Sequence, residues 1–129
     1  MTGEVLKVLL ADDEEEFVST LAERLTLRGL EVKTVFRGEE ALSLLSEEDF
    51  QVAVIDFMMP DISGLEVLRK ARLTDSGLEV LILTGRGSTR EGIEGMQLGA
   101  FDYLMKPVDI EILIGRIRAA AEKSKRNET

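Results

Sequence analysis

The sequence predicts an α/β domain built on a single doubly wound, five-stranded parallel sheet. Strand-like and helix-like patterns alternate five times along the chain, with short joints and no repeat, linker or low-complexity segment. Alternation of this kind implies parallel strands with helices covering both faces of the sheet. The length of 129 residues suits one domain with a core of its own. We therefore expect residues 1–129 to form one (βα)5 unit with no second domain.

The composition of the five predicted strands sets their order in the sheet. The first, third and fourth contain the nearly continuous apolar runs VLLA, VAVI and VLIL, which are typical of central strands buried on both faces. The second and fifth are interrupted by polar residues, as edge strands are. With right-handed crossovers the expected order is 2-1-3-4-5, the flavodoxin-like arrangement. The predicted strands are Val5–Ala11, Glu31–Phe36, Gln51–Asp56, Leu78–Thr84 and Phe101–Met105.

The first and last helices are predicted from apolar residues at helical spacing. The first stripe is followed by Gly29, which we expect to end that helix. The acidic run Glu14–Glu16 lies at the start of the first helix, where carboxylates interact favourably with the helix dipole, and we assign it that role. The stripes comprise Phe17, Val18, Leu21 and Leu25 in the first helix, and Ile110, Leu113, Ile114, Ile117 and Ala121 in the last.

Charge and composition exclude several classes of function. The chain has 25 acidic and 16 basic residues, a net charge of −9, and neither histidine nor cysteine. A Ser-His-Asp triad, a histidine-bound zinc ion, a disulfide and a cysteine nucleophile are therefore impossible. Direct nucleic-acid binding is not expected, because it depends on cations that neutralise phosphates. Without a long apolar run or a signal peptide, we expect a cytoplasmic protein that does not contact the membrane.

Polar residues gather at the carboxyl ends of four predicted strands. Asp12 and Asp13 end the first strand, Asp56 ends the third, Thr84 ends the fourth, and Lys106 follows the fifth. In a doubly wound sheet, ligands bind beyond this end of the strands, where the winding reverses. Here the reversal lies between the first and third strands. We therefore expect three carboxylates, one hydroxyl and one ammonium group at a single edge of the sheet.

This set of groups suits a magnesium ion and a phosphoryl group. Three adjacent carboxylates repel one another unless a cation lies between them. Magnesium prefers oxygen ligands and is bound by a few carboxylates together with water and phosphate. An ionised aspartate is a competent nucleophile for phosphoryl transfer. The sequence therefore favours phosphorylation of an aspartate with magnesium as the cofactor.

In these residues the chain resembles the receiver domain of two-component response regulators. The similarity rests on Asp12-Asp13, on DFMMPDISG beginning at Asp56, on LTGRG around Thr84, and on FDYLMKP ending at Lys106-Pro107. It covers the chain from Val5 to the end of the last helix, near Lys125. Any one of these motifs is unspecific, but together, in order at the correct strand ends, they are highly specific. The resemblance implies a signalling switch and not an enzyme.

The resemblance assigns roles to individual residues. Asp56 would accept the phosphoryl group, and Met58 and Arg86 would flank the path of attacking water. Because Met58 adds bulk and offers no polar group to orient that water, we expect slow autodephosphorylation. Thr84 and Tyr103 would form the switch, and the Lys106-Pro107 peptide bond would be cis. The implied magnesium site consists of Asp12 (through water), Asp13, Asp56 and the backbone carbonyl of Met58, and the implied phosphoryl-binding groups are Lys106, Thr84 and Gly85.

The resemblance also implies partners. The phosphoryl donor would be the phosphohistidine of a sensor histidine kinase or phosphotransfer protein, which agrees with the absence of histidine in this chain. The fourth helix, the fifth strand and the fifth helix would form the face that signals to an output domain or to a second copy. Because the predicted elements end with the fifth helix, no output domain is expected within the chain.

Three other functions are weighed against this one. A haloacid-dehalogenase-type phosphatase would need an acid two residues after the nucleophile, where Met58 stands. A nucleotide or flavin binder would need a glycine-rich loop, but the segment GRGSTR has Arg90 in place of the last glycine and follows the wrong strand. A docking module without phosphorylation is disfavoured by the presence of Asp56, Thr84 and Lys106.

Overall fold

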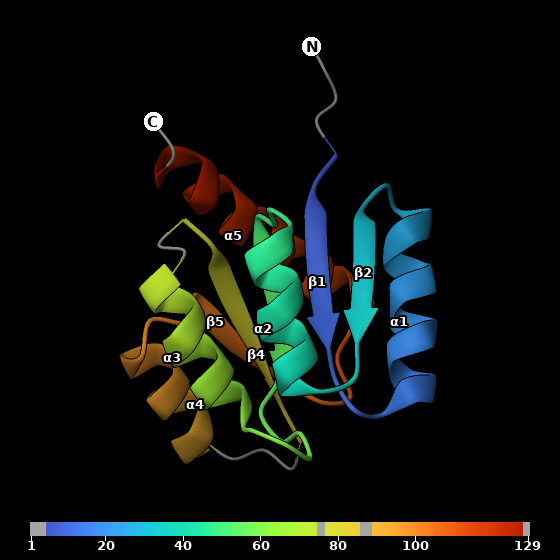
Figure 1. Ribbon diagram of the computed structural model, residues 1–129. Coiled ribbons are helices and arrows are strands. Elements are labelled where there is room, and N and C mark those ends of the chain that lie inside the picture. Colours follow the sequence, from blue (N-terminus) through green and yellow to red (C-terminus); the bar gives the residue numbers. More distant parts are fainter. Residues whose placement is uncertain (1–4, 75–76, 86–88, 128–129) are drawn as a thin grey trace.

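The chain folds into a five-stranded parallel sheet between two layers of helices (Figure 1). The computed structural model describes residues 5–74, 77–85 and 89–127. The strand order is β2-β1-β3-β4-β5 and every neighbouring pair is parallel, which confirms the predicted fold. The strands are β1 (Lys7–Ala11), β2 (Glu31–Val35), β3 (Val52–Asp56), β4 (Glu79–Thr84) and β5 (Asp102–Met105).

Burial follows the order of the strands. All residues of β3 and β4 are buried, as are the last four of β1, because helices cover both faces of the central strands. The edge strands β2 and β5 have no buried residue. Most strands begin one or two residues later than predicted, because the apolar pattern extends into the segment that enters the sheet. Their carboxyl ends agree with the prediction to within one residue.

The five helices divide between the two faces of the sheet. They are α1 (Glu15–Leu27), α2 (Gly38–Glu47), α3 (Gly64–Thr74), α4 (Thr89–Gln97) and α5 (Ile110–Asn127). The predicted stripes of α1 and α5 pack together against one face, in a core that includes Val18, Leu25 and Leu113. The other face is covered by α2 and α3, with Ala41 and Val67 in its core. Gly95 of α4 faces Ile82 on this second side.

Glycine ends two of the helices. Gly29 follows α1 with a φ of 90°, and Gly99 follows α4 with a φ of 102°. These left-handed conformations strain residues that have a Cβ atom, so glycine is favoured just after a helix. The predicted end of the first helix is therefore confirmed. Within the part of the chain that the structure describes, no helix is long and apolar enough to cross a membrane.

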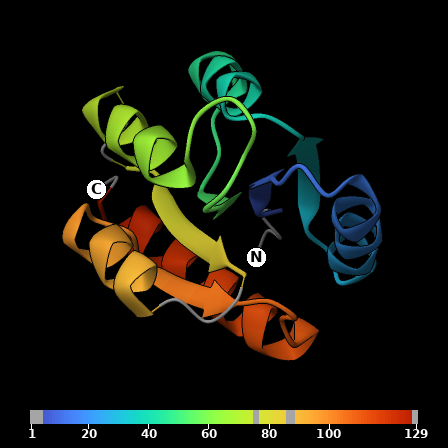
Figure 2. The same cartoon turned by 90° about the horizontal axis from the view of Figure 1, so that it is seen from below.

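The strands all point toward the same end of the molecule, which Figure 2 shows from that side. There, α3 begins close to the end of β3. The N–H of Gly64 donates a hydrogen bond of 2.8 Å to the carbonyl of Phe57. A Cβ atom at Gly64 would collide with the backbone carbonyl of Asp56 and lie 3.1 Å from the Cα of Phe57. This contact allows the loop after β3 to fold tightly beneath the end of the strand.

We predict that Gly64→Ala destabilises the fold by about 1–3 kcal/mol, because the new methyl group forces backbone atoms apart. The matched control is Gly115→Ala in α5, where a Cβ atom would meet nothing within 4 Å. That change should leave the free energy of unfolding unchanged or raise it by about 1 kcal/mol, since alanine favours helix more than glycine does. Urea unfolding of both variants measures the difference. Equal stability of the two variants would contradict the close contact at Gly64.

Candidate functional site

The register of the sheet brings the predicted acidic residues together. Ala11 of β1 lies opposite Ile55 of β3, so Asp12 and Asp56, each one residue further on, end adjacent strands. Asp12 is fully buried and Asp56 is 5% exposed, whereas Asp13 is exposed. Each of the three residues offers a carboxylate oxygen, and these oxygens lie within 4.8 Å of one another. Burial of two neighbouring carboxylates is costly without a cation.

Lys106 supplies positive charge to this cluster. Its ammonium lies 2.7 Å from Asp12 Oδ2 and 3.1 Å from Asp56 Oδ1, and its side chain is only 15% exposed. The ring of Phe17 lies beneath the ammonium, with 4.8 Å between the nitrogen and the ring centroid. The backbone N–H of Lys106 donates a hydrogen bond to the backbone carbonyl of Thr84, which connects the end of β5 to the end of β4. The Lys106–Pro107 peptide bond is cis, as the resemblance implies.

Electrostatics at the cluster follow from burial and from these contacts. Burial raises the pKa of Asp56 to about 6, repulsion from Asp12 adds to this effect, and Lys106 opposes it. Burial also raises the pKa of Asp12, although the contact with the Lys106 ammonium and the hydrogen bond from the Glu14 N–H oppose the shift. The pKa of Lys106 is raised, because its contacts with Asp12 and Glu14 outweigh the effect of burial. The ammonium is therefore charged at neutral pH.

Thr84 contributes an unsatisfied hydroxyl group at the end of β4. The residue is fully buried, and its Oγ1 has no hydrogen-bond partner in the described part of the chain. Leaving a buried hydroxyl unpaired costs about 1–3 kcal/mol. Thr84 follows Leu83, which lies opposite Asp56 in the sheet, and it lies opposite Met105, next to Lys106. Its hydroxyl is therefore an unused donor close to the strand ends that carry Asp56 and Lys106.

Several of the remaining predicted residues line an open cleft of about 1010 Å³. Its lining residues are Asp13, Glu14, Phe17, Asp56, Met58, Gly85, Glu91, Lys106 and Pro107. Met58 lines this cleft and is 68% exposed. Tyr103 is half-buried on β5, and its ring packs against Gly92 of α4, so it lies outside the cleft. Arg86 lies outside the residues that the structure describes.

Two residues of this region were not predicted from the sequence. Glu14 contacts Lys106, with 2.7 Å between Oε1 and Nζ, although we assigned its charge only to the helix dipole. Asp61, in the loop after β3, accepts hydrogen bonds from the N–H groups of Gly38 and Glu39 at the start of α2. Burial opposes the effect, but hydrogen bonds from backbone N–H groups, these two among them, together outweigh it and lower the pKa of Asp61 to about 2. Asp61 thereby anchors the loop that holds Met58.

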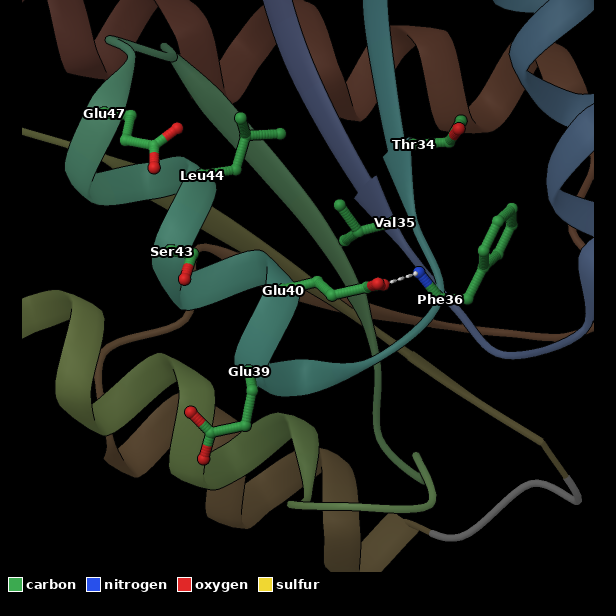
Figure 3. Close-up of a pocket in the computed structure, with 8 residues that line it drawn as sticks. All are labelled: Thr34, Val35, Phe36, Glu39, Glu40, Ser43, Leu44 and Glu47. Atoms are coloured by element: carbon green, nitrogen blue, oxygen red, sulfur yellow. Dashed lines mark hydrogen bonds between the residues drawn. The ribbon is translucent and has the colours of Figure 1, made fainter.

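A second hollow, of about 450 Å³, lies between β2 and α2 (Figure 3). Its only hydrogen bond drawn in the figure runs from the Phe36 N–H to Glu40 Oε1, at 3.0 Å. No lysine or arginine is among its lining residues, so it has no group to hold an anion. These residues are Thr34, Val35, Phe36, Glu39, Glu40, Ser43, Leu44 and Glu47. The candidate site is therefore the cleft at Asp56.

The fold and the site together define a response regulator receiver domain. Residues 8–118 match the model of that family, and the chain belongs to it. Receiver domains are the switches of two-component signalling and not classical enzymes, and they generally bind magnesium. The donors here fit that ion, because the three carboxylates offer hard oxygen ligands close to one another.

Individual relatives agree with this assignment. The chain is 39% identical over 117 residues to the uncharacterized transcriptional regulatory protein YkoG of Bacillus subtilis (strain 168), covering 91% of this chain and 51% of YkoG. It is 38% identical over 120 residues to the response regulator MprA of Mycobacterium leprae (strain TN), covering 93% of this chain and 53% of MprA. The chain thus spans about half the length of these curated relatives.

Solved structures show the same fold. The receiver domain of the Francisella response regulator 1452 aligns with a TM-score of 0.86 and 34% identity, covering 92% of this chain and 98% of that one. A receiver domain protein from Clostridium thermocellum aligns with a TM-score of 0.89 and 33% identity, covering 94% of this chain and 98% of that one.

The raised pKa of Asp56 predicts how stability depends on pH without metal. Because the folded-state pKa of about 6 exceeds the ordinary aspartate value of 3.8, the stability that protonation contributes is complete below about pH 4 and is lost as pH rises through 6. Asp56→Asn should therefore raise the free energy of unfolding at pH 7 by about 1–3 kcal/mol, and the gain should shrink toward pH 4.

Urea unfolding in a metal chelator, measured between pH 4 and pH 8, checks this pH dependence. The control is Asp49→Asn, an exposed residue that precedes β3 at the opposite end of the sheet. The difference in free energy of unfolding between Asp49→Asn and wild type should not vary with pH in this way. A gain for Asp56→Asn that is constant across the range would contradict the raised pKa.

Proposed function

We propose that this receiver domain is a switch that is activated by phosphorylation of Asp56. The donor would be a phosphohistidine on a sensor histidine kinase or phosphotransfer protein. The observation that best supports this role is the placement of Asp56: a buried carboxylate that lines an open cleft, 3.1 Å from the ammonium of Lys106. We propose that residues 1–129 act as one receiver unit.

The proposed reaction is a displacement at phosphorus. A carboxylate oxygen of Asp56 attacks, an oxygen–phosphorus bond forms, and the phosphorus–nitrogen bond to the donor imidazole breaks. The electron pair of that bond stays on the imidazole nitrogen of the donor. Asp56 must be ionised to attack, and since its pKa is about 6, most of it is ionised at neutral pH.

Several groups of the site would stabilise the transferred phosphoryl group. Bound magnesium would neutralise the carboxylates and the phosphoryl oxygens; Asp13, Asp56 and the carbonyl of Met58 would hold it, with Asp12 acting through water. Lys106 would donate charge-assisted hydrogen bonds to a phosphoryl oxygen. The unpaired Thr84 hydroxyl and the backbone N–H of Gly85 would donate to others.

The lifetime of the phosphoryl group would depend on the rim of the cleft. Attack by water needs a polar group to orient the water molecule, and the exposed thioether side chain of Met58 provides only a weak acceptor. We therefore propose slow autodephosphorylation. The proposed contribution of Arg86 concerns a residue outside the described ranges.

The signal would leave the site through Thr84. Donation to a phosphoryl oxygen draws this side chain toward Asp56 and vacates space beside β5, into which the ring of Tyr103 can turn. That ring now packs on Gly92, so its movement would change the contact between β5 and α4. Exposed apolar residues on α4, β5 and α5, among them Ile93, Met96, Met105 and Ile112, would then meet an output domain or a second copy.

Phosphorylation of Asp56 is testable by intact mass. After incubation with acetyl phosphate and magnesium, we expect one added phosphoryl group, which Asp56→Asn abolishes because the nucleophile is lost. Omission of magnesium should suppress the labelling. The control variant Asp49→Asn should be labelled like wild type. Labelling that persists in Asp56→Asn would place the phosphoacceptor elsewhere, and catalytic release of inorganic phosphate from phosphate esters would indicate a phosphatase.

The switch is testable with Thr84→Ala and beryllofluoride, which mimics a phosphoryl group. The variant should still bind the mimic at Asp56 but lose most of the chemical-shift change at Tyr103 and Gly92. The reason is that alanine has no hydroxyl to donate a hydrogen bond to the mimic, so the end of β4 is not drawn toward Asp56. The control is Thr34→Ala on the edge strand β2, which should respond as wild type does. A full response at Tyr103 in Thr84→Ala would show that the signal follows another route.

A further inference from the structure

Three carboxylates surround the ammonium of Lys106. Its distances are 2.7 Å to Asp12 Oδ2, 2.7 Å to Glu14 Oε1 and 3.1 Å to Asp56 Oδ1. The contact with Glu14 is a hydrogen bond, whereas Asp12 Oδ2 meets the ammonium as an ion pair and has no hydrogen-bond partner in the described part of the chain. Because three carboxylates already lie within 3.1 Å of the ammonium, a phosphoryl group that binds Lys106 competes with these partners.

Among the residues that the structure describes, Lys106 is the partner that explains the position of the Glu14 carboxylate. Glu14 is the N-cap residue of α1, but its side chain makes no capping hydrogen bond. Glu15 and Glu16, both exposed in the first turn, already complement the helix dipole. Its backbone N–H donates to Asp12 Oδ1 at 2.9 Å, which holds the two residues in place, while its carboxylate reaches Lys106.

The three partners of Lys106 differ in how easily they can leave. Asp12 is fully buried and would lose its compensating charge. Asp56 is itself the proposed phosphoacceptor. The Glu14 side chain is 63% exposed, so its carboxylate can return to water with little loss of hydration. Glu14 is thus the partner that a phosphoryl group displaces at the lowest cost.

We infer that Glu14 is a positioning residue that holds the Lys106 ammonium beside unphosphorylated Asp56. Its carboxylate competes with the phosphoryl group for this ammonium. The inference rests on the proposed phosphorylation of Asp56. In the unphosphorylated protein, Glu14 keeps Lys106 beside Asp12 and Asp56. On phosphorylation the ammonium exchanges Glu14 for a phosphoryl oxygen, and this exchange weakens the binding of the phosphoryl group.

The test is the affinity of the magnesium-loaded protein for beryllofluoride, measured by NMR titration. Glu14→Gln removes the competing charge and should tighten binding by roughly two- to fivefold, the factor expected from an exposed ion pair. The matched control is Glu15→Gln, which makes the same change in net charge on the next residue, without a contact to Lys106 in the structure. The comparison between these two variants removes the general effect of charge on anion binding.

A second measurement separates positioning from a merely structural role. In the metal-free protein, the ¹⁵N resonance of the Lys106 ammonium should shift in Glu14→Gln and stay unchanged in Glu15→Gln. Equal affinities in the two variants, weaker binding in Glu14→Gln or an unmoved Lys106 resonance would each overturn the inference. A wild-type protein that fails to bind beryllofluoride would instead refute the proposed function, so the two failures are distinguishable.

Discussion

The ion contacts between Lys106 and the buried carboxylates of Asp12 and Asp56 are the interaction on which the site depends. Two acids with almost no exposure to water lie side by side, and without a cation their mutual repulsion would oppose folding. The ammonium reduces this cost but does not remove it, as the raised pKa of Asp56 shows. A site under such strain is sensitive to any further charge, whether a metal ion or a phosphoryl group.

The architecture provides the rigidity that keeps these charges together. The fully buried strands β3 and β4 fix Asp56 and Thr84 at their ends, and the hydrogen bond from Lys106 to the Thr84 carbonyl fixes β5 beside them. Gly64 permits the loop after β3 to turn beneath Asp56. Tyr103 is less constrained, since it lies half-buried on an edge strand against α4. The proposed switch thus combines a buried site with a residue on the edge of the sheet.

Most of the fold and much of the site were predictable, for identifiable reasons. Continuous apolar runs distinguish central from edge strands, and parallel strands bring their carboxyl ends together, so the proximity of Asp12, Asp13 and Asp56 followed from order alone. The role of Glu14 did not follow. An acid at the start of a helix has a sufficient explanation in the helix dipole, and no pattern reveals that its side chain turns toward a lysine 92 positions away.

The sequence by itself determined which chemical groups exist, the alternation that builds the sheet and the strand ends at which those groups lie. These features are local or periodic, and backbone geometry converts them directly into topology. Only the tertiary structure decided that Lys106 contacts three acids, that the Thr84 hydroxyl is buried without a partner, and that Asp61 anchors α2. Such contacts depend on side-chain directions and on distances of a few ångströms between remote segments, which packing sets and sequence spacing does not encode.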